Sequence, residues 1–573
     1  MNASSVLHTA NTGESFAPSL RFSEEMIDRL RACGVEEVFK ASTSLFIRGD
    51  RNVDMFVVLD GEIEVFESTG RGDGKIVAVL TEGQFTGELD LLDGRQTLLD
   101  CRTLKRSRVL RINRAHLQRI MRSNYEIADL IMRASIGRRF DIVRHGSGGV
   151  LLIGQEHSAD TIRLQRFLTR NGYPYRLLDA EKDPDSLIRD TAFVLGHLPV
   201  VLLPNQRILS NPSNALLADE LGLTDLRDSS TVYDVAIVGA GPAGLAAAVY
   251  AASEGLSTIV IEGTAPGGQA GTSSRIENYL GFPTGVSGQE LSERSLAQAQ
   301  KFGARFAISR DVLSMSREGT RYALHLQDGQ PVHTRTVVIA TGARYQKLNV
   351  PNYERFEYQG IHYAATSMEA GLCRGQEVVV AGAGNSAGQA ALFLSQTAKR
   401  VYLLVRGDSL QATMSDYLVQ RILASSRISL HIRTEIVSMD GDDRLRNVTW
   451  RDNASMQLQT REISNMFVMI GASPKTTWLC ASLAVDAKGF IITGSPAGSE
   501  AFFGTSQQGV YAVGDVRSGS VKRVASAVGE GSVVVSDIHK YLATLNSNND
   551  SSIGIAKYDP IIPDDIRSLT AAA

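Results

Sequence analysis

The stretch Val235-Ala236-Ile237-Val238-Gly239-Ala240-Gly241-Pro242-Ala243-Gly244 decides the fold of this chain. Its four apolar residues indicate a buried strand, and the alanine-rich run from Pro242 indicates a helix. Between the two, Gly239 permits a tight turn, Gly241 lets a pyrophosphate approach the backbone, and Gly244 lets helix and strand pack closely. The helix N-terminus then attracts phosphate. The stretch therefore predicts an α/β domain that binds a dinucleotide.

Glu262 ends the strand that follows the first helix, where the ribose of the first dinucleotide needs a carboxylate.

A second glycine loop lies further along the chain. The second loop comprises Gly382, Ala383, Gly384, Asn385, Ser386 and Ala387, and it follows the apolar strand Val378–Ala381. Arg406 ends the next strand and suits the 2′-phosphate of NADPH, with NADH as the alternative. Two dinucleotides side by side indicate hydride transfer through a flavin.

Further motifs resemble those of low-molecular-weight thioredoxin reductases over residues 231–546. They comprise Gly267-Gly268-Gln269, Ile276-Glu277-Asn278-Tyr279, the strand ending Ala340-Thr341-Gly342, the crossover Met469–Thr476, the Gly514-Asp515 motif, and a helix opened by Arg523-Val524-Ala525. The resemblance implies FAD at the first loop, NADPH at the second, hydride transfer to flavin N5, and a homodimer. That last helix is expected to point at the flavin pyrimidine, where its positive end stabilises the reduced ring.

The dithiol of that family is missing. Cys33, Cys101, Cys373 and Cys480 form no Cys-x-x-Cys pair, and isolated cysteines favour buried core positions in a cytoplasmic protein. In the matching stretch, Ala364 and Ser367 take the two cysteine positions. Neighbouring Tyr363 either caps the flavin or is a structural aromatic residue.

Three functions stay open. The first is an oxidoreductase that passes electrons to another acceptor: a ferredoxin- or flavodoxin-like protein, a quinone or oxygen. The second is a ligand- and redox-responsive sensor in which turnover is incidental. The third, a thioredoxin-disulfide reductase, is disfavoured because a thiolate is needed to attack a disulfide.

The sequence pattern of residues 1–143 predicts a β-barrel followed by helices. A hairpin is expected from Met55–Leu59 and Ile63–Phe66 around Asp60-Gly61, with helices from Arg114. The run Phe85–Leu92 resembles the phosphate-binding cassette of cyclic nucleotide-binding domains. That resemblance implies effector contacts from Gly87, Glu88, Leu89 and Arg95. However, Thr97 occupies the register of the phosphate-binding arginine, so a regulatory barrel with another ligand or none is favoured over cyclic nucleotide binding.

Residues 148–224 alternate strands and helices and resemble a glutaredoxin/thioredoxin-like domain, with Pro199 in the place of the family's cis-proline. Gln155–Thr161 stands where the active dithiol belongs and contains no cysteine, so docking or spacing is the expected use. Solvated linkers are expected at 144–149 and 224–230.

The predicted fold is therefore multidomain, because 573 residues exceed a single core. The expected order is the barrel, the small α/β domain, a first FAD segment at 231–345, the NAD(P)H domain at 346–471, a second FAD segment at 472–546, and a tail at 547–573. A net charge of −3 argues against nucleic-acid binding, and no apolar run is long enough to span a membrane. No metal site is expected.

Overall fold

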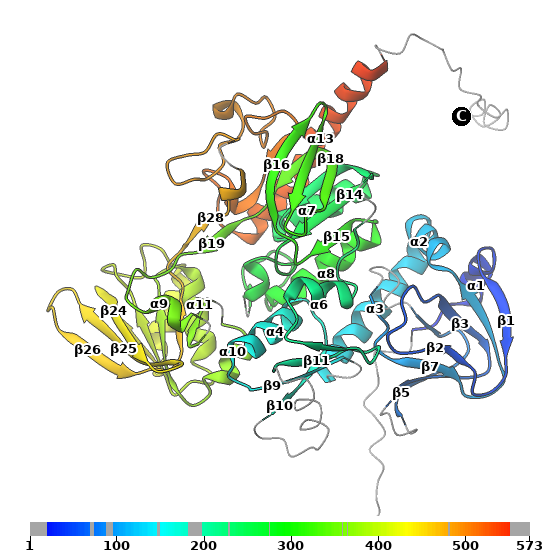
Figure 1. Ribbon diagram of the computed structural model, residues 1–573, viewed down its shortest axis with the longest axis horizontal. Helices are drawn as coiled ribbons and strands as arrows, with labels where there is room; N and C mark the ends of the chain where they lie inside the picture. Colours follow the sequence, from blue (N-terminus) through cyan, green and yellow to red (C-terminus); the bar gives the residue numbers. More distant parts are fainter. Residues whose placement is uncertain are drawn as a thin grey trace, which may run out of the picture.

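The computed structural model describes residues 20–68, 74–87, 95–145, 149–180, 198–226, 230–273, 275–357, 359–363, 365–479 and 482–550. Figure 1 shows four bodies: a blue barrel, a cyan small domain at the centre, a first dinucleotide domain in green and orange, and a second dinucleotide domain in yellow-green and yellow. The second dinucleotide domain is inserted into the first, and the small domain lies below the first and between the second and the barrel (Figure 1).

The barrel consists of two four-stranded sheets, ordered β1-β8-β3-β6 and β2-β7-β4-β5. Its elements are α1 (Glu24–Arg31), β1 (Val35–Phe39), β2 (Ser44–Phe46), β3 (Met55–Asp60), β4 (Ile63–Glu67), β5 (Lys75–Leu80), β6 (Phe85–Thr86), β7 (Asp100–Thr103), β8 (Ser107–Ile112), α2 (Arg114–Ser123) and α3 (Tyr125–His145). Strand β3 is a nearly continuous apolar run because both of its faces are buried. Met55, Val57 and Leu59 pack with the helices, and Phe56 and Val58 pack in a second buried cluster between the sheets.

The predicted hairpin between β3 and β4 is wrong. β3 pairs with β6 and β8, whereas β4 pairs with β5 and β7 in the other sheet. Gly61 has φ +101°, and a Cβ there would lie 2.6 Å from the Cα of Ser107. The Asp-Gly turn therefore carries the chain from one sheet to the other, with Ser107 packed against it.

The small domain has one sheet ordered β10-β9-β11-β12, in which β9 and β10 are parallel and the other pairs are antiparallel. Its elements are β9 (Val150–Gly154), α4 (Ala159–Arg170), β10 (Tyr175–Asp179), β11 (Val200–Leu202), β12 (Ile208–Ser210) and α6 (Asn214–Glu220). Ser158 caps α4, and its hydroxyl accepts a hydrogen bond from the backbone N–H of Thr161. The Leu198–Pro199 peptide bond is cis.

Both predicted linkers are partly structured. α3 extends to His145, into the first one. In the second, Asp225 N donates to Phe306 O over 2.7 Å, and Thr224 Oγ1 donates to Ile308 O over 2.8 Å. The polar composition of residues 224–226 thus reflects pairing along the edge of the first dinucleotide domain rather than exposure to solvent. Residues 146–148 and 227–229 lie outside the described residues.

The first dinucleotide domain has a sheet ordered β15-β14-β13-β18-β17-β16, and β29 pairs with β18. Its elements are β13 (Val232–Val238), α7 (Pro242–Ser253), β14 (Thr258–Glu262), α8 (Gly288–Lys301), β15 (Arg305–Ile308), β16 (Val312–Glu318), β17 (Arg321–Leu326), β18 (Pro331–Ile339), β29 (Val510–Ala512) and α13 (Val524–Asp550). Helices α7 and α13 share a buried cluster with the small domain, so these two domains have one continuous core.

The second dinucleotide domain has a parallel sheet ordered β20-β27-β21-β22-β23 beside an antiparallel sheet β24-β25-β26. Its elements are α9 (Tyr353–Phe356), β20 (Ile361–His362), α10 (Ser367–Leu372), β21 (Glu377–Ala381), α11 (Asn385–Leu394), β22 (Arg400–Leu404), α12 (Asp416–Ala424), β23 (Ile428–His431), β24 (Thr434–Gly441), β25 (Leu445–Asp452), β26 (Leu458–Glu462) and β27 (Met466–Val468). The chain enters and leaves through paired strands β19 (Ala343–Tyr345) and β28 (Ala472–Pro474) (Figure 1).

Helix α13 continues to Asp550, so the start of the predicted tail at 547–573 is helical. Extending an existing helix costs less free energy than nucleating a new one. Asparagine and serine residues can therefore continue the helix beyond its apolar turns. Residues 551–573 lie outside the described residues. Among those described, no helix is both long and apolar enough to cross a membrane.

Candidate active site

The first glycine loop connects β13 to α7 in a way that leaves room for a phosphate. Gly239 has φ +105°, and a Cβ there would lie 2.4 Å from the carbonyl oxygen of Ala340. Gly241 is the N-cap of α7 and makes no side-chain cap, so the first N–H groups of the helix stay available. A Cβ on Gly244 would lie 1.9 Å from Gly239 O, which requires glycine for packing. Pro242 and Ala243 form the first turn, and the loop fits a pyrophosphate.

Glu262 lies at the end of β14 and faces this loop. Its Oε2 accepts from Ala240 N over 2.8 Å, and its Oε1 accepts from Thr264 N over 2.9 Å and Ala265 N over 3.3 Å. A carboxylate offers about four acceptor positions, so one on Oε2 is left for a ribose hydroxyl. The same hydrogen bonds hold the glycine loop in shape.

The other predicted FAD residues lie on separate segments. A Cβ on Gly268 would lie 3.0 Å from the Cα of Gly241, so these two backbones are in close contact. The side chain of Gln269 donates to Ala343 O over 2.5 Å, and Thr341 Oγ1 donates to Lys475 O over 3.1 Å. Of the remaining predicted residues, Ala340 is buried, Gly342 has φ +63°, and Asn278 is exposed. Exposed Arg523 precedes helix α13, which begins with Val524 and Ala525.

Burial raises the pKa of Asp515, and the nearby Lys522 ammonium lowers it again. The preceding Gly514 donates its N–H to Glu530 over 2.6 Å, and Glu530 also pairs with Arg517 at 2.6 Å. The motif that carries Asp515 is therefore fixed by a nearly buried ion pair. The sequence reasoning missed Arg517 and Glu530, although their proximity to Gly514 in the sequence was a usable signal.

The second glycine loop repeats the first between β21 and α11. Gly382 has φ +144°, and Gly384 is the N-cap of α11, again without a side-chain cap. Asn385 Oδ1 accepts from Ser415 N over 2.7 Å, which anchors the loop to the segment before α12. Ser386 lies in the first turn of α11 and Ala387 is fully buried beneath it. Exposed Arg406 follows β22 and makes no side-chain hydrogen bond or ion pair with any described residue.

The stretch that replaces the dithiol begins with the buried strand β20. His362 is 2% exposed, and its Nε2 lies 2.8 Å from Asn465 Oδ1. Its Nδ1 lies 2.9 Å from Arg166 Nη2 on α4 of the small domain. Because arginine can only donate, Nδ1 accepts and Nε2 carries the proton. This tautomer links the small domain to the second dinucleotide domain.

The other residues of this stretch are placed as follows. Tyr363 Oη donates to Glu357 over 2.7 Å and accepts from Tyr353, and burial raises its pKa. Ala364 lies outside the described residues, and Ser367 is exposed at the start of α10. Cys373 is fully buried, as predicted, and burial raises the pKa of its thiol to about 11. No thiolate is available here.

We expect the stability of this region to fall as pH drops from 6.5 to about 4. Burial first and the Arg166 cation second lower the pKa of His362 to about 4, against an opposing effect of Glu369 and Asn465. In that window the unfolded chain binds the extra proton, so stability rises with pH, by about 3 kcal/mol in total. Urea midpoints at pH 4.5 and 7 measure the effect. His362→Gln, whose amide can replace both hydrogen bonds, should have the shallower pH dependence, and equal slopes would contradict the assignment.

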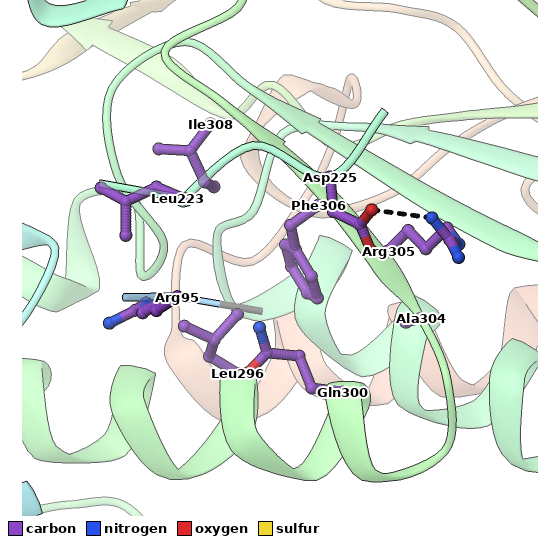
Figure 2. Close-up of a pocket in the computed structure, with 10 residues that line it drawn as sticks. Arg95, Leu223, Asp225, Leu296, Gln300, Ala304, Arg305, Phe306 and Ile308 are labelled. Carbon is purple, nitrogen blue, oxygen red and sulfur yellow. Dashed lines mark hydrogen bonds and ion pairs between the residues drawn. The ribbon is translucent and has the colours of Figure 1, made fainter. Parts of the chain in front are cut away.

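Of the predicted effector residues, Arg95 lies at the junction of three domains. Gly87 has φ +89° beside Asp54, whereas Glu88 and Leu89 lie outside the described residues. Arg95 is 6% exposed and lines a cavity of about 20 Å³ between the barrel, the small domain and the first dinucleotide domain. Figure 2 shows its side chain beside Leu296 and Gln300 of α8. Thr97, in the register of the phosphate-binding arginine, donates its hydroxyl to Ile47 O over 2.7 Å.

The sequence profile of pyridine nucleotide-disulphide oxidoreductases matches residues 233–531, more than half of the chain. The chain belongs to this family. The thioredoxin reductase of Mycolicibacterium smegmatis is 33% identical over 315 residues, which cover 55% of this chain and 98% of that relative. The thioredoxin reductase of Treponema pallidum is 33% identical over 318 residues, covering 55% and 99%.

Solved structures agree with this placement. The crystal structure of Lactococcus lactis thioredoxin reductase (FR conformation) aligns with a TM-score of 0.51 and 29% identity, covering 55% of this chain and 99% of that one. Thioredoxin reductase of T. acidophilum aligns with a TM-score of 0.50 and 29% identity, covering 55% and 99%. The profile of cyclic nucleotide-binding domains matches residues 36–124.

These comparisons confirm the predicted combination of an N-terminal domain of the cyclic nucleotide-binding family with a thioredoxin reductase-like module. The chain is an FAD-dependent NAD(P)H oxidoreductase, and its cofactors are FAD and NADPH. The residue-by-residue assignments to these two cofactors stay predictions.

Proposed function

We propose that this oxidoreductase passes electrons from NADPH through FAD to an acceptor other than an internal dithiol. The observation that carries this proposal is the replacement of both cysteines by Ala364 and Ser367, in a chain without any Cys-x-x-Cys pair. Cys373, the nearest thiol in sequence, is buried with a raised pKa and is not a nucleophile. A ferredoxin- or flavodoxin-like protein, a quinone or oxygen is the proposed acceptor.

The chain's own residues bind and orient the two cofactors. The uncapped N-termini of α7 and α11 hold the pyrophosphates, Glu262 holds a ribose, and Arg406 holds the 2′-phosphate of NADPH. When bound, NADPH supplies a hydride and FAD accepts it and releases electrons singly or in pairs. No protein acid or base is required for the hydride step.

A group of exposed side chains beside the Asp515 motif supports a protein acceptor. Phe502 and Val521 are 68% and 59% exposed, and the exposed cations Lys522 and Arg523 follow directly. Arg517 lies over the Phe502 ring, 5.8 Å from its centroid. Apolar contacts surrounded by positive charge favour a partner with an acidic surface. This arrangement favours a ferredoxin- or flavodoxin-like protein over a quinone or oxygen.

We also propose that the barrel regulates the reaction through direct contacts. The side chains of Arg51 and Gln96, close to the cassette, donate to the carbonyl oxygen of Glu220 at the end of α6, over 2.7 and 2.9 Å. The neighbouring Asp219 carboxylate accepts from Arg310 over 2.6 Å, and Arg310 N donates to Glu262 O over 3.0 Å. These contacts connect the cassette region to the backbone of Glu262, the residue whose carboxylate is proposed to hold the ribose.

The domain and partner predictions complete this proposal. The strand order of the small domain, with its cis Leu198–Pro199 bond, supports a thioredoxin-like fold that has lost its chemistry. Leu280 is 92% exposed beside the stacked rings of Tyr279 and Phe282, which supports a homodimer contact. Native mass measurement tests the dimer. A cytoplasmic location is proposed from the isolated cysteines.

Anaerobic stopped-flow mixing with NADPH tests the function. We expect the flavin absorbance to bleach within seconds and to return when oxidised ferredoxin or flavodoxin is added, while an added thioredoxin disulfide stays oxidised. No bleaching would favour the sensor, in which turnover is incidental. Robust thioredoxin reduction would instead overturn the assignment of Ala364 and Ser367 as replacements for the dithiol.

A further inference from the structure

One face of helix α4 contacts both dinucleotide domains. Arg166 and Arg170 are four residues apart, so their side chains lie on the same face of the helix. Arg170 donates to the carbonyl oxygen of Gly268 over 3.0 Å, in the predicted flavin-contacting stretch of the first dinucleotide domain. Arg166 donates to His362 over 2.9 Å, in the second. The small domain therefore bridges the two dinucleotide domains.

The C-terminal end of α4 is firmly held by the first dinucleotide domain. Asn171, which is 5% exposed, donates to Thr264 O over 3.3 Å. The side chain of Gln289 on α8 donates to Thr169 O over 3.0 Å. Phe167 and Leu168 belong to the buried cluster that includes α7. This end of the bridge therefore moves with the first dinucleotide domain as one body.

The contact between α4 and the second dinucleotide domain is polar and largely shielded from solvent. Besides its bond to His362, Arg166 lies 3.5 Å from the Glu369 carboxylate, with side chains 18% and 6% exposed. His362 is in turn bonded to Asn465, whose amide donates to Gln376 over 3.0 Å. Arg166 thus binds a network that continues into the sheet of that domain. Charge-assisted hydrogen bonds in such surroundings are among the strongest.

The orientation held in this way directs the second glycine loop toward the predicted flavin-contacting stretch. Thr413 Oγ1 donates to Ala383 O over 2.8 Å, so the segment before α12 lies against that loop. On α12 itself, Arg421 pairs with Glu277 of the flavin-contacting stretch at 2.8 Å. The nucleotide loop and the flavin-contacting stretch are therefore connected through one helix, on the side of the domain that faces the first.

We propose that Arg166 is a positioning residue for hydride transfer: through His362 and Glu369 it holds the second dinucleotide domain in the orientation that presents NADPH to the flavin. This inference rests on the proposed function. The chain has no Cys-x-x-Cys pair to present to the flavin, so a single fixed orientation serves the proposed reaction.

Two variants of α4 separate positioning from folding. Arg166→Ala removes the contact with the second dinucleotide domain, and Arg163→Ala is the matched control. Among the described residues, the Arg163 side chain bonds within the small domain, to Asp160, Asn211, Pro212 and Asn214. We expect flavin reduction by NADPH to slow about 10-fold in Arg166→Ala and to be unchanged in Arg163→Ala. Arg166→Lys, which keeps the charge, should restore part of the rate.

A distance measurement tests the same proposal without turnover. Spin labels at Leu313→Cys and Leu458→Cys report on the two dinucleotide domains, since both positions are exposed, in a background of Cys33→Ser and Cys480→Ser. We expect one narrow distance distribution in the unaltered and Arg163→Ala chains and a broad one in Arg166→Ala. An unchanged distribution, or an unchanged or faster rate in Arg166→Ala, would overturn the positioning role. Failure of NADPH to reduce the unaltered chain would instead refute the proposed function. The distance measurement needs no turnover, so it would still test whether Arg166 fixes the orientation of the two domains.

Discussion

Replacing Gly384 with alanine is expected to raise the KM for NADPH by about 10- to 100-fold while the chain stays folded with FAD bound. Gly384 has φ −87° and ψ 176°, which alanine adopts freely, and a Cβ there would meet nothing within 4 Å. The added methyl group would instead occupy the space that the pyrophosphate needs at the N-terminus of α11. Losing one charge-assisted phosphate contact costs about 1.5–3 kcal/mol, which gives the stated range.

Gly371→Ala is the matched control, because Gly371 lies in the same domain and its Cβ would also meet nothing within 4 Å. Steady-state rates against NADPH concentration, with the flavin spectrum as a measure of bound FAD, separate the two variants. A KM in Gly384→Ala equal to that of Gly371→Ala would mean that the pyrophosphate binds elsewhere. Loss of FAD in Gly384→Ala would mean that the two loops are assigned in the wrong order.

The dinucleotide domains were predictable because their signals are local. Gly239, Gly241 and Gly244 fall within six residues. The structure reproduces the steric reasons for Gly239 and Gly244 in their backbone contacts, whereas the predicted role of Gly241 in admitting a pyrophosphate stays a prediction. The β3–β4 hairpin failed for the opposite reason. Nothing near Asp60-Gly61 reveals that Ser107, far along the chain, packs against that turn and separates the strands into two sheets.

The bridge through α4 was not predictable from the sequence either. Arg166 and Arg170 have the ordinary appearance of solvated charges on an amphipathic helix. Their partners, His362 and the carbonyl of Gly268, come from two other domains and meet them only after the small domain has docked. Arg95 was expected in an effector pocket by its place near a cassette, yet it is buried against α8 because the barrel docks there as well. The surroundings of these arginines are therefore set by contacts between domains, which local sequence motifs do not reveal.

Within the first loop, Gly241→Ala and Gly244→Ala should fail in different ways. In Gly241→Ala the Cβ would be 3.9 Å from the Cα of Gly268, an ordinary contact, so the FAD-free chain should be as stable as the unaltered FAD-free chain. We nevertheless expect it to lose most of its FAD on dialysis, because the methyl group blocks the pyrophosphate. The ratio of flavin to protein absorbance measures this loss.

In Gly244→Ala the Cβ would be 1.9 Å from Gly239 O and 3.3 Å from the Ala340 side chain, so α7 must move away from β13. Such overpacking typically costs about 1–3 kcal/mol, and here it falls in the core that α7 shares with α13 and the small domain. We therefore expect a lower urea midpoint even without FAD. The comparison must be made between FAD-free chains, since bound FAD itself stabilises the folded state. Equal midpoints for the two variants would show that Gly244, like Gly241, serves only the cofactor, and that the helix can shift without loss.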